Sequence, residues 1–289
     1  MAEGGLTTVS DAKNSGLLLL NKDKGITSRD LVNDVCKVLK TKKVGHLGTL
    51  DPMAEGLMLI PVNDALKVAY LLASMDKTYH VKALFGFETD TLDLEGRVIE
   101  KAGYTLDKDK VISVLESFNR TYLQEVPKYS AKKVNGKKLY EYARNNIEVE
   151  LPKTKVAISG IKLLNLNDKE IEFTCHVTSG TYIRSLIRDI GKKLSIPMTM
   201  SYLKRTSQGP YKLEDASSLD NYHLISIYDM LKGRNLVEAG NELINKIKHG
   251  QILNDIYGDN PIFIDKDKKV LAIYEKYVDG LIKPRKVLI

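Results

Sequence analysis

The chain has 289 residues and 43% of them are hydrophobic, which suffices for one large domain with a sizeable core and one smaller domain. The formal net charge of +7 and the pI near 9.0 point mildly towards a polyanionic partner. Two cysteines without a CxxC pair exclude a disulfide framework and argue against a zinc site, and no apolar run approaches the about 18 residues of a membrane span.

Residues 1–15 have neither the basic start nor the apolar core of a signal peptide, so we expect a disordered lead and a cytoplasmic protein. Behind this lead, hydrophobic periodicity and capping residues predict short strands mixed with short helices. In chain order these are a buried strand at 17–20, a helix from 28 to 39, a strand at 56–62, a short helix at 64–74 and a strand at 77–87.

The second half of the chain continues without strict alternation of strands and helices. We predict, in order, a helix at 106–119, paired strands at 154–164 and 170–178, an amphipathic helix at 181–194 and a polar helical connector at 220–236. Beyond residue 236, one helix at 241–249 and β-like runs at 261–264, 270–274 and 281–288 indicate a small β-rich module. The whole pattern favours an α+β fold in which helices flank a mainly antiparallel sheet.

The most informative segment is the glycine-rich stretch 45–58, GHLGTLDPMAEGLM. Its glycines can take positive φ or allow another backbone to come close, and Pro52 biases Asp51 towards extended geometry. Asp51 is therefore a carboxylate aimed by its backbone. The alternative from the residues alone is an ordinary Asp-Pro turn.

This stretch resembles the catalytic motif of the TruB family, the enzymes that isomerise uridine to pseudouridine in the T arm of tRNA. Four more segments resemble family motifs in family order, so that the resemblance covers roughly residues 16–207. They are GLLLLNKDKGITS at 16–28, KTYHVKALFGFETDTLDLEG at 77–96, VPKYSAKKVNGKKLYEYAR at 126–144 and VTSGTYIRSLIRDIG at 177–191. One departure is Asn21-Lys22-Asp23, where the family usually has Asp-Lys-Pro; Lys22 itself is retained.

The resemblance implies a domain plan and an activity. It implies a pseudouridine synthase core at 16–235 with an RNA-gripping insertion at about 126–152, followed by a PUA-like RNA-binding barrel at 236–289. The implied reaction breaks the C1′–N1 bond of a T-loop uridine, rotates the base and forms a C1′–C5 bond. Nothing enters or leaves in this isomerisation, so we expect neither a cofactor nor a metal.

Three residues are candidates for the chemistry. Asp51 matches the family nucleophile, a role that a carboxylate also fills in glycoside chemistry. Arg184 matches the arginine that pairs with it, and a guanidinium suits this task because it binds carboxylate through a planar fork. Tyr79 matches the tyrosine that stacks on the target base. Without the resemblance, Arg184 reads as a solvated helix residue and Tyr79 as a core tyrosine.

Six further residues are candidates for binding the substrate. By resemblance, His46 fills the space left by the extruded base, Leu203 lines the pocket, and Lys22 belongs to the lysine-bearing loop near it. Tyr182, beside Arg184, is expected in the same wall. Residues 127–155 carry eight Lys or Arg and three acidic residues, and Lys132 and Lys133 are the proposed phosphate contacts. Among these lysines, Lys133 aligns with a family lysine near the target nucleotide.

Three readings of the function stay open at this point. The favoured one is a synthase that acts on the T arm and elbow of tRNA as a monomer without an obligatory protein partner. The second is a tRNA-binding or folding chaperone without chemistry, against which the intact Asp51, Tyr79 and Arg184 argue. The third is a guide-RNA-dependent pseudouridine synthase, against which the complete segment 126–144 argues.

Overall fold

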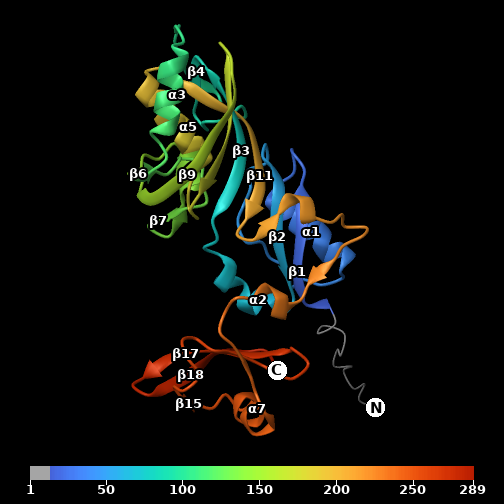
Figure 1. Ribbon diagram of the computed structural model, residues 1–289. Coiled ribbons are helices and arrows are strands. Elements are labelled where there is room, and N and C mark those ends of the chain that lie inside the picture. The colour runs from blue at the N-terminus through green and yellow to red at the C-terminus, as the bar shows by residue number, and fades with distance from the viewer. Residues whose placement is uncertain (1–13) are drawn as a thin grey trace.

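The computed structural model describes residues 14–289 (Figure 1). The disordered lead predicted for residues 1–15 lies outside this range except for its last two residues, Asn14 and Ser15. The Asn63 side chain donates a hydrogen bond to the Asn14 carbonyl at 3.1 Å, and the Asp64 N–H donates to the Ser15 hydroxyl at 3.3 Å. These two residues therefore contact the segment that follows β2.

A nine-stranded sheet forms the body of the protein. Its strands are β1 Gly16–Lys22, β2 Glu55–Val62, β3 Lys77–Phe85, β6 Thr121–Glu125, β9 Lys153–Leu166, β10 Glu170–Val177, β11 Met198–Gln208, β12 Tyr211–Lys212 and β13 Leu224–Ile225. Across the sheet they run β13-β1-β2-β11-β3-β10-β9-β6, and β12 pairs with β11. Only the β2–β11 pairing is parallel, so the sheet is mainly antiparallel, as the sequence predicted.

Helices cover this sheet unevenly (Figure 1). They are α1 Ser28–Val38, α2 Ala65–Val68 with the 3-10 turn η2 Ala69–Leu72, α3 Lys108–Glu116, α4 Leu139–Arg144, α5 Ile183–Leu194, the 3-10 turn η3 Leu213–Asp215, α6 Ile227–Met230 and α7 Asn241–Lys248. The capping box of Thr27 and Asp30 starts α1 where the sequence predicted. Tyr182 keeps an extended backbone, so α5 starts two residues later than predicted. In the part of the chain that the structure describes, no helix is long and apolar enough to span a membrane.

Both faces of the first strands are buried, which explains their continuous apolar runs. Because side chains alternate along a strand, Leu18 and Leu20 join the core beneath α1, α3 and α5. Leu17 and Leu19 point the other way, into a second cluster with η2, α6 and the C-terminal strands. The sheet that carries the site is therefore fixed from both sides.

The C-terminal residues form a separate five-stranded sheet, drawn in orange and red in Figure 1. Its strands are β14 Leu236–Glu238, β15 Leu253–Asn254, β16 Ile262–Ile264, β17 Val270–Val278 and β18 Leu281–Val287, in the order β14-β16-β17-β18-β15. The sheet has its own core, in which Phe263 packs edge-to-face against Tyr257 and Tyr274. This curled sheet is consistent with a PUA-like module. It also contributes Ile262, Ile264, Val270 and Ile273 to the second cluster of the main sheet.

The polar helical connector predicted for residues 220–236 is wrong. Leu224 and Ile225 instead form β13 at the edge of the main sheet, paired with Leu18 and Leu17. Only one helical turn, α6, follows; it ends at Met230, and Gly233 beyond it has a φ of +83°. Strand pairing at an open edge outweighs the weak helical pattern of this segment.

Candidate active site

A cavity of about 400 Å³ lies where the loop 46–51, strands β3 and β11 and the beginning of α5 meet. Its walls contain most of the residues that the sequence proposed for the site, although these come from four separate parts of the chain. The proposed residues that line it are His46, Asp51, Tyr79, Tyr182, Arg184 and Leu203. Lys22, Lys132 and Lys133 lie outside its lining.

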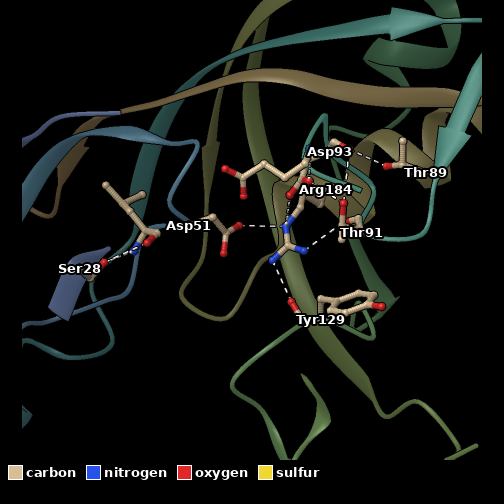
Figure 2. Close-up of polar contacts among 9 residues, drawn as sticks. Ser28, Asp51, Thr89, Thr91, Asp93, Tyr129 and Arg184 are labelled. Carbon is tan, nitrogen blue, oxygen red and sulfur yellow. Dashed lines mark hydrogen bonds and ion pairs between the residues drawn. The ribbon is translucent and has the colours of Figure 1, made fainter. Parts of the chain in front are cut away.

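Asp51 is aimed into this cavity by hydrogen bonds to its neighbours in the chain. The Ser28 hydroxyl at the start of α1 bonds both the N–H and the carbonyl of Leu50, each at 2.9 Å (Figure 2). On the other side, the Pro52 carbonyl accepts from the Gly25 N–H at 2.8 Å. The turn thus has little freedom, while the Asp51 side chain remains 34% exposed and within reach of a ligand.

Arg184 meets Asp51 with all three arms of its guanidinium engaged (Figure 2). Its Nε lies 2.9 Å from Asp51 Oδ2, its Nη1 donates to the Thr91 carbonyl at 3.0 Å, and its Nη2 donates to the Tyr129 carbonyl at 3.1 Å. Arg184 is only 5% exposed, so the alternative of a solvated helix residue is wrong. A guanidinium held at all three nitrogens keeps the carboxylate in one orientation and places a positive charge beside it.

A second carboxylate lies behind Arg184. Asp93, on the acidic turn 90–96, is 3.8 Å from Arg184 Nε and almost fully buried. Its Oδ1 accepts from the Thr91 hydroxyl at 2.6 Å and from the Glu95 N–H at 3.1 Å. The acidic turn 90–96 therefore helps to orient Arg184.

Aromatic and apolar side chains form the remaining walls. Tyr79 on β3 is 6% exposed, and burial raises the pKa of its phenol. Tyr182, the residue before α5, is held by its N–H, which donates to the Gln124 side chain at 2.8 Å. With Leu203 on β11, these rings give the cavity surfaces suited to a flat, partly polar ring such as a nucleobase.

His46 lies at the start of the loop 46–51 and lines the same cavity. Its Nδ1 accepts a hydrogen bond from the Gly48 N–H at 3.4 Å. Burial lowers the pKa of His46, and the positive charges of Arg29 and Arg205 lower it further, so its ring is neutral near pH 7. A neutral ring is suited to stacking on bases and poorly suited to pairing with phosphate.

The structure gives Lys22 a different place from the proposed one. Its side chain is fully buried, and its Nζ donates to the carbonyls of Asp23, Ile26 and Pro52 at 2.9, 2.7 and 3.3 Å. These bonds use all three donors of the ammonium, so none is left for RNA. Lys22 ties the β1–α1 loop to the turn that carries Asp51.

Lys132 and Lys133 lie on the insertion (residues 126–152) and are exposed to solvent. The insertion contains the small hairpin β7 Lys133–Val134 and β8 Lys137–Lys138, followed by α4. Just before the two lysines, Ser130 and Ala131 line the cavity. Both ammonium groups are thus free to meet a phosphate close to the mouth of the site, which leaves the proposed contact as a prediction.

Comparison with known proteins agrees with this geometry. The pattern of the TruB family pseudouridylate synthase (N terminal domain) matches residues 36–183. "tRNA pseudouridine synthase B" of Mycoplasma mycoides subsp. mycoides is 40% identical over 282 residues, which cover 94% of this chain and 96% of that protein. The chain belongs to the TruB family. The protein of the same name from Staphylococcus aureus is also 40% identical and is covered to 99% of its length.

Two solved structures contain chains with the same fold as this protein. A Cbf5-Nop10-Gar1 complex contains a chain that superimposes with a TM-score of 0.70 at 21% identity, covering 95% of this chain and 85% of that one. An H/ACA RNP bound to a substrate RNA contains a chain with a TM-score of 0.69 at the same identity. At this identity the likeness concerns the fold, including the C-terminal sheet.

Two basic residues that line this cavity were not predicted from the sequence. Lys77 and Arg205 both line it and both are buried. Burial, with a smaller effect from Arg205, lowers the pKa of Lys77 to about 8. Residues two positions apart on a strand point to the same face of the sheet. Lys77 is two residues before Tyr79, and Arg205 is two residues after Leu203, so this spacing could have indicated both. It went unused for Arg205 because β11 was not predicted as a strand.

Proposed function

We propose that this protein isomerises a uridine in the T loop of tRNA to pseudouridine, as a monomer and without a protein partner. Membership of the TruB family makes it a pseudouridine synthase, and its relatives are named for tRNA. The observation that carries the proposal is the 2.9 Å contact of Asp51 with the buried Arg184 in a cavity walled by Tyr79 and Leu203.

Asp51 supplies the nucleophile in this proposal. The guanidinium of Arg184, 2.9 Å away, compensates the negative charge of its carboxylate at close range. Tyr79 and Leu203 then hold the freed uracil while it rotates, so that C5 rather than N1 faces C1′. The cavity surrounds the base during this step and keeps it close to the sugar that it must rejoin.

The target uridine has to leave the folded T loop before it can enter the cavity. Extruding a base costs a few kcal/mol. His46, which lines the cavity, then occupies the space that the base vacates. The insertion provides the exposed Lys132 and Lys133 as phosphate contacts beside the cavity. The C-terminal sheet then contacts a more distant part of the same tRNA.

A bare tRNA transcript and the purified protein alone test this proposal. Pseudouridine is mapped by carbodiimide modification and primer extension after incubation without any guide RNA. We expect one pseudouridine, in the T loop, and none when that uridine is replaced by cytidine. Tight binding without product would favour a chaperone, and product that appears only with added guide RNA and partner proteins would favour the guide-dependent reading.

A further inference from the structure

Arg205 is the largest side chain in the described range that is fully buried, with 1% of its surface exposed. It forms no ion pair with a carboxylate of residues 14–289, and its Nη1 is buried without a hydrogen-bond partner there. Burying an uncompensated charge costs several kcal/mol. Because the Arg205 guanidinium also lines the cavity, we looked for a role of its charge in the reaction.

The other nitrogens of the guanidinium hold the loop 46–51 against strand β2. Nε donates to the Leu57 carbonyl at 2.6 Å, and Nη2 donates to the Gly48 carbonyl at 3.1 Å. Gly48 has a φ of +137°, and a Cβ there would lie 3.3 Å from Nη1, so the loop and the guanidinium approach closely. Gln208 adds a second link, because its Nε2 donates to the Leu47 carbonyl at 2.6 Å.

The charge of Arg205 lies beside Tyr79. The two residues are direct partners across the antiparallel β3–β11 ladder, so their side chains leave the sheet on the same face. Burial raises the pKa of the Tyr79 phenol, whereas the charge of Arg205 lowers it. The other titratable groups around Tyr79 or in the same cavity are Asp51 and His46 from the loop, Cys175 from β10, Tyr182 just before α5, Arg184 from α5 and Lys77 from its own strand.

We propose that Arg205 is a positioning residue that keeps a positive charge at the Tyr79 hydroxyl, so that Tyr79 can carry the proton of the isomerisation. This inference rests on the proposed function. The reaction moves one proton from C5 to N1 while C1′–C5 replaces C1′–N1. Tyr79 gives its proton to N1 and later takes the proton from C5. The electron pair of the broken C5–H bond restores the C5–C6 double bond, and Tyr79 ends neutral.

In this scheme each of the two anionic oxygens of the site has its own buried guanidinium. Arg184 compensates the Asp51 carboxylate, and Arg205 compensates the transient Tyr79 phenolate. The Nη1 of Arg205, which has no hydrogen-bond partner in the described residues, is then available to donate a hydrogen bond to the phenolate. A purely structural arginine would instead act only through the two carbonyls that it binds, Gly48 on the loop 46–51 and Leu57 on β2.

A double-mutant cycle separates these roles under single-turnover conditions with saturating protein. Arg205→Met removes the charge at similar volume, and Tyr79→Phe removes the proton carrier. We expect Arg205→Met to slow product formation roughly 100-fold or more in the wild-type background, and by less than about fivefold once Tyr79→Phe is present. Equal factors in both backgrounds would overturn the proposal.

The second readout is the isotope effect with tRNA that carries deuterium at uridine C5. Arg205→Met should make C5 proton removal slow enough to give an isotope effect of about twofold or more. Gln208→Leu is the matched control, because it removes a loop link and leaves the charge. Its slowing should show no isotope effect. Isotope effects that are absent in Arg205→Met or equal in both variants would reduce Arg205 to a loop anchor.

Arg205→Lys keeps the test open if Arg205→Met does not fold. It retains a charge near Tyr79 but loses the fork, so we expect a rate within about tenfold of wild type without an isotope effect. A loss as large as that of Arg205→Met or of Tyr79→Phe would contradict the proposal. Failure of the wild-type protein to form pseudouridine would refute the proposed function, whereas the cycle and the isotope effect test only Arg205.

Discussion

The catalytic cavity and the insertion (residues 126–152) use polar side chains in opposite ways. In the cavity, Arg184 is 5% exposed, each arm of its guanidinium has a partner, and Asp51 stands on a turn fixed from both flanks. On the insertion, Lys132 and Lys133 are exposed. A catalysed reaction requires that the reacting groups are held in one geometry. Contact with a phosphate backbone, in contrast, can be made by flexible side chains. Changes in the cavity should therefore affect rate, and changes on the insertion should affect affinity.

Asp51→Asn should have the largest effect. The amide keeps the shape of the side chain but cannot act as the nucleophile, so we expect turnover to fall at least about 1,000-fold, or about 4 kcal/mol. Binding of tRNA, measured by filter retention, should change less than about twofold. Asp23→Asn, an exposed aspartate outside the cavity, serves as the control. Residual turnover within about tenfold of wild type would remove Asp51 from this role.

Arg184→Lys should come next. Lysine keeps the charge but cannot hold Asp51, Thr91 and Tyr129 with one planar fork, so we expect the rate to fall roughly 100-fold. Arg188→Lys is the matched control, since Arg188 is equally buried on α5 but pairs with Glu125 and Asp189. It should lower the melting temperature comparably and leave the bound-state rate near wild type. Equal rate losses in both variants would mean that the effect comes from α5 as a whole.

Removal of residues 236–289 should act first on stability. The C-terminal sheet contributes Ile262, Ile264, Val270 and Ile273 to the hydrophobic cluster that also contains Leu17, Leu57 and Leu59, and exposing one buried leucine costs about 1.5–3 kcal/mol. We expect a lower melting temperature and weaker binding of whole tRNA. Modification of an isolated T-arm hairpin should continue at a similar rate at low temperature. Loss of hairpin modification in a truncated protein that is still folded would make this sheet part of the active site.

The pair Lys132→Ala and Lys133→Ala should have the smallest effect, on affinity alone. Each lost phosphate contact lowers the slope of log affinity against log salt by roughly 0.7–0.9, so the double variant should lose about 1.4–1.8. If Lys132 faces solvent in the complex, only Lys133 contributes and the change is half as large. Lys108→Ala with Lys110→Ala on α3 removes the same charge elsewhere as a control. An unchanged salt slope would show that neither lysine contacts phosphate.

Local signals predicted much of the fold. The capping residues Thr27 and Asp30, the alternation along β3 and the helical spacing in α5 each fix one element almost by themselves. By contrast, β13 could not be read from the sequence, because Leu224 and Ile225 become a strand only by pairing with β1. The contact between the C-terminal sheet and the main sheet likewise depends on which faces meet, and no local pattern records that.

The site was predicted as residues rather than as geometry. The family resemblance named Asp51, Tyr79 and Arg184, and the structure brings them to one cavity. The sequence reasoning also offered Lys22 as a substrate contact, but three backbone carbonyls occupy its ammonium. Arg205 went unnoticed because its meaning comes from its partners, the Gly48 carbonyl and Tyr79, which lie far from it in the sequence.

The division between cavity and insertion is tested most directly by one single-turnover experiment at saturating protein. Asp51→Asn and the Lys132/Lys133 double alanine variant are compared with wild type on the same bare tRNA, and tritium release from C5 of uridine reports the rate. The account predicts no measurable release from Asp51→Asn at normal affinity, and a near wild-type saturated rate from the lysine variant at reduced affinity. A saturated rate that falls with the lysines, or persists in Asp51→Asn, would contradict it.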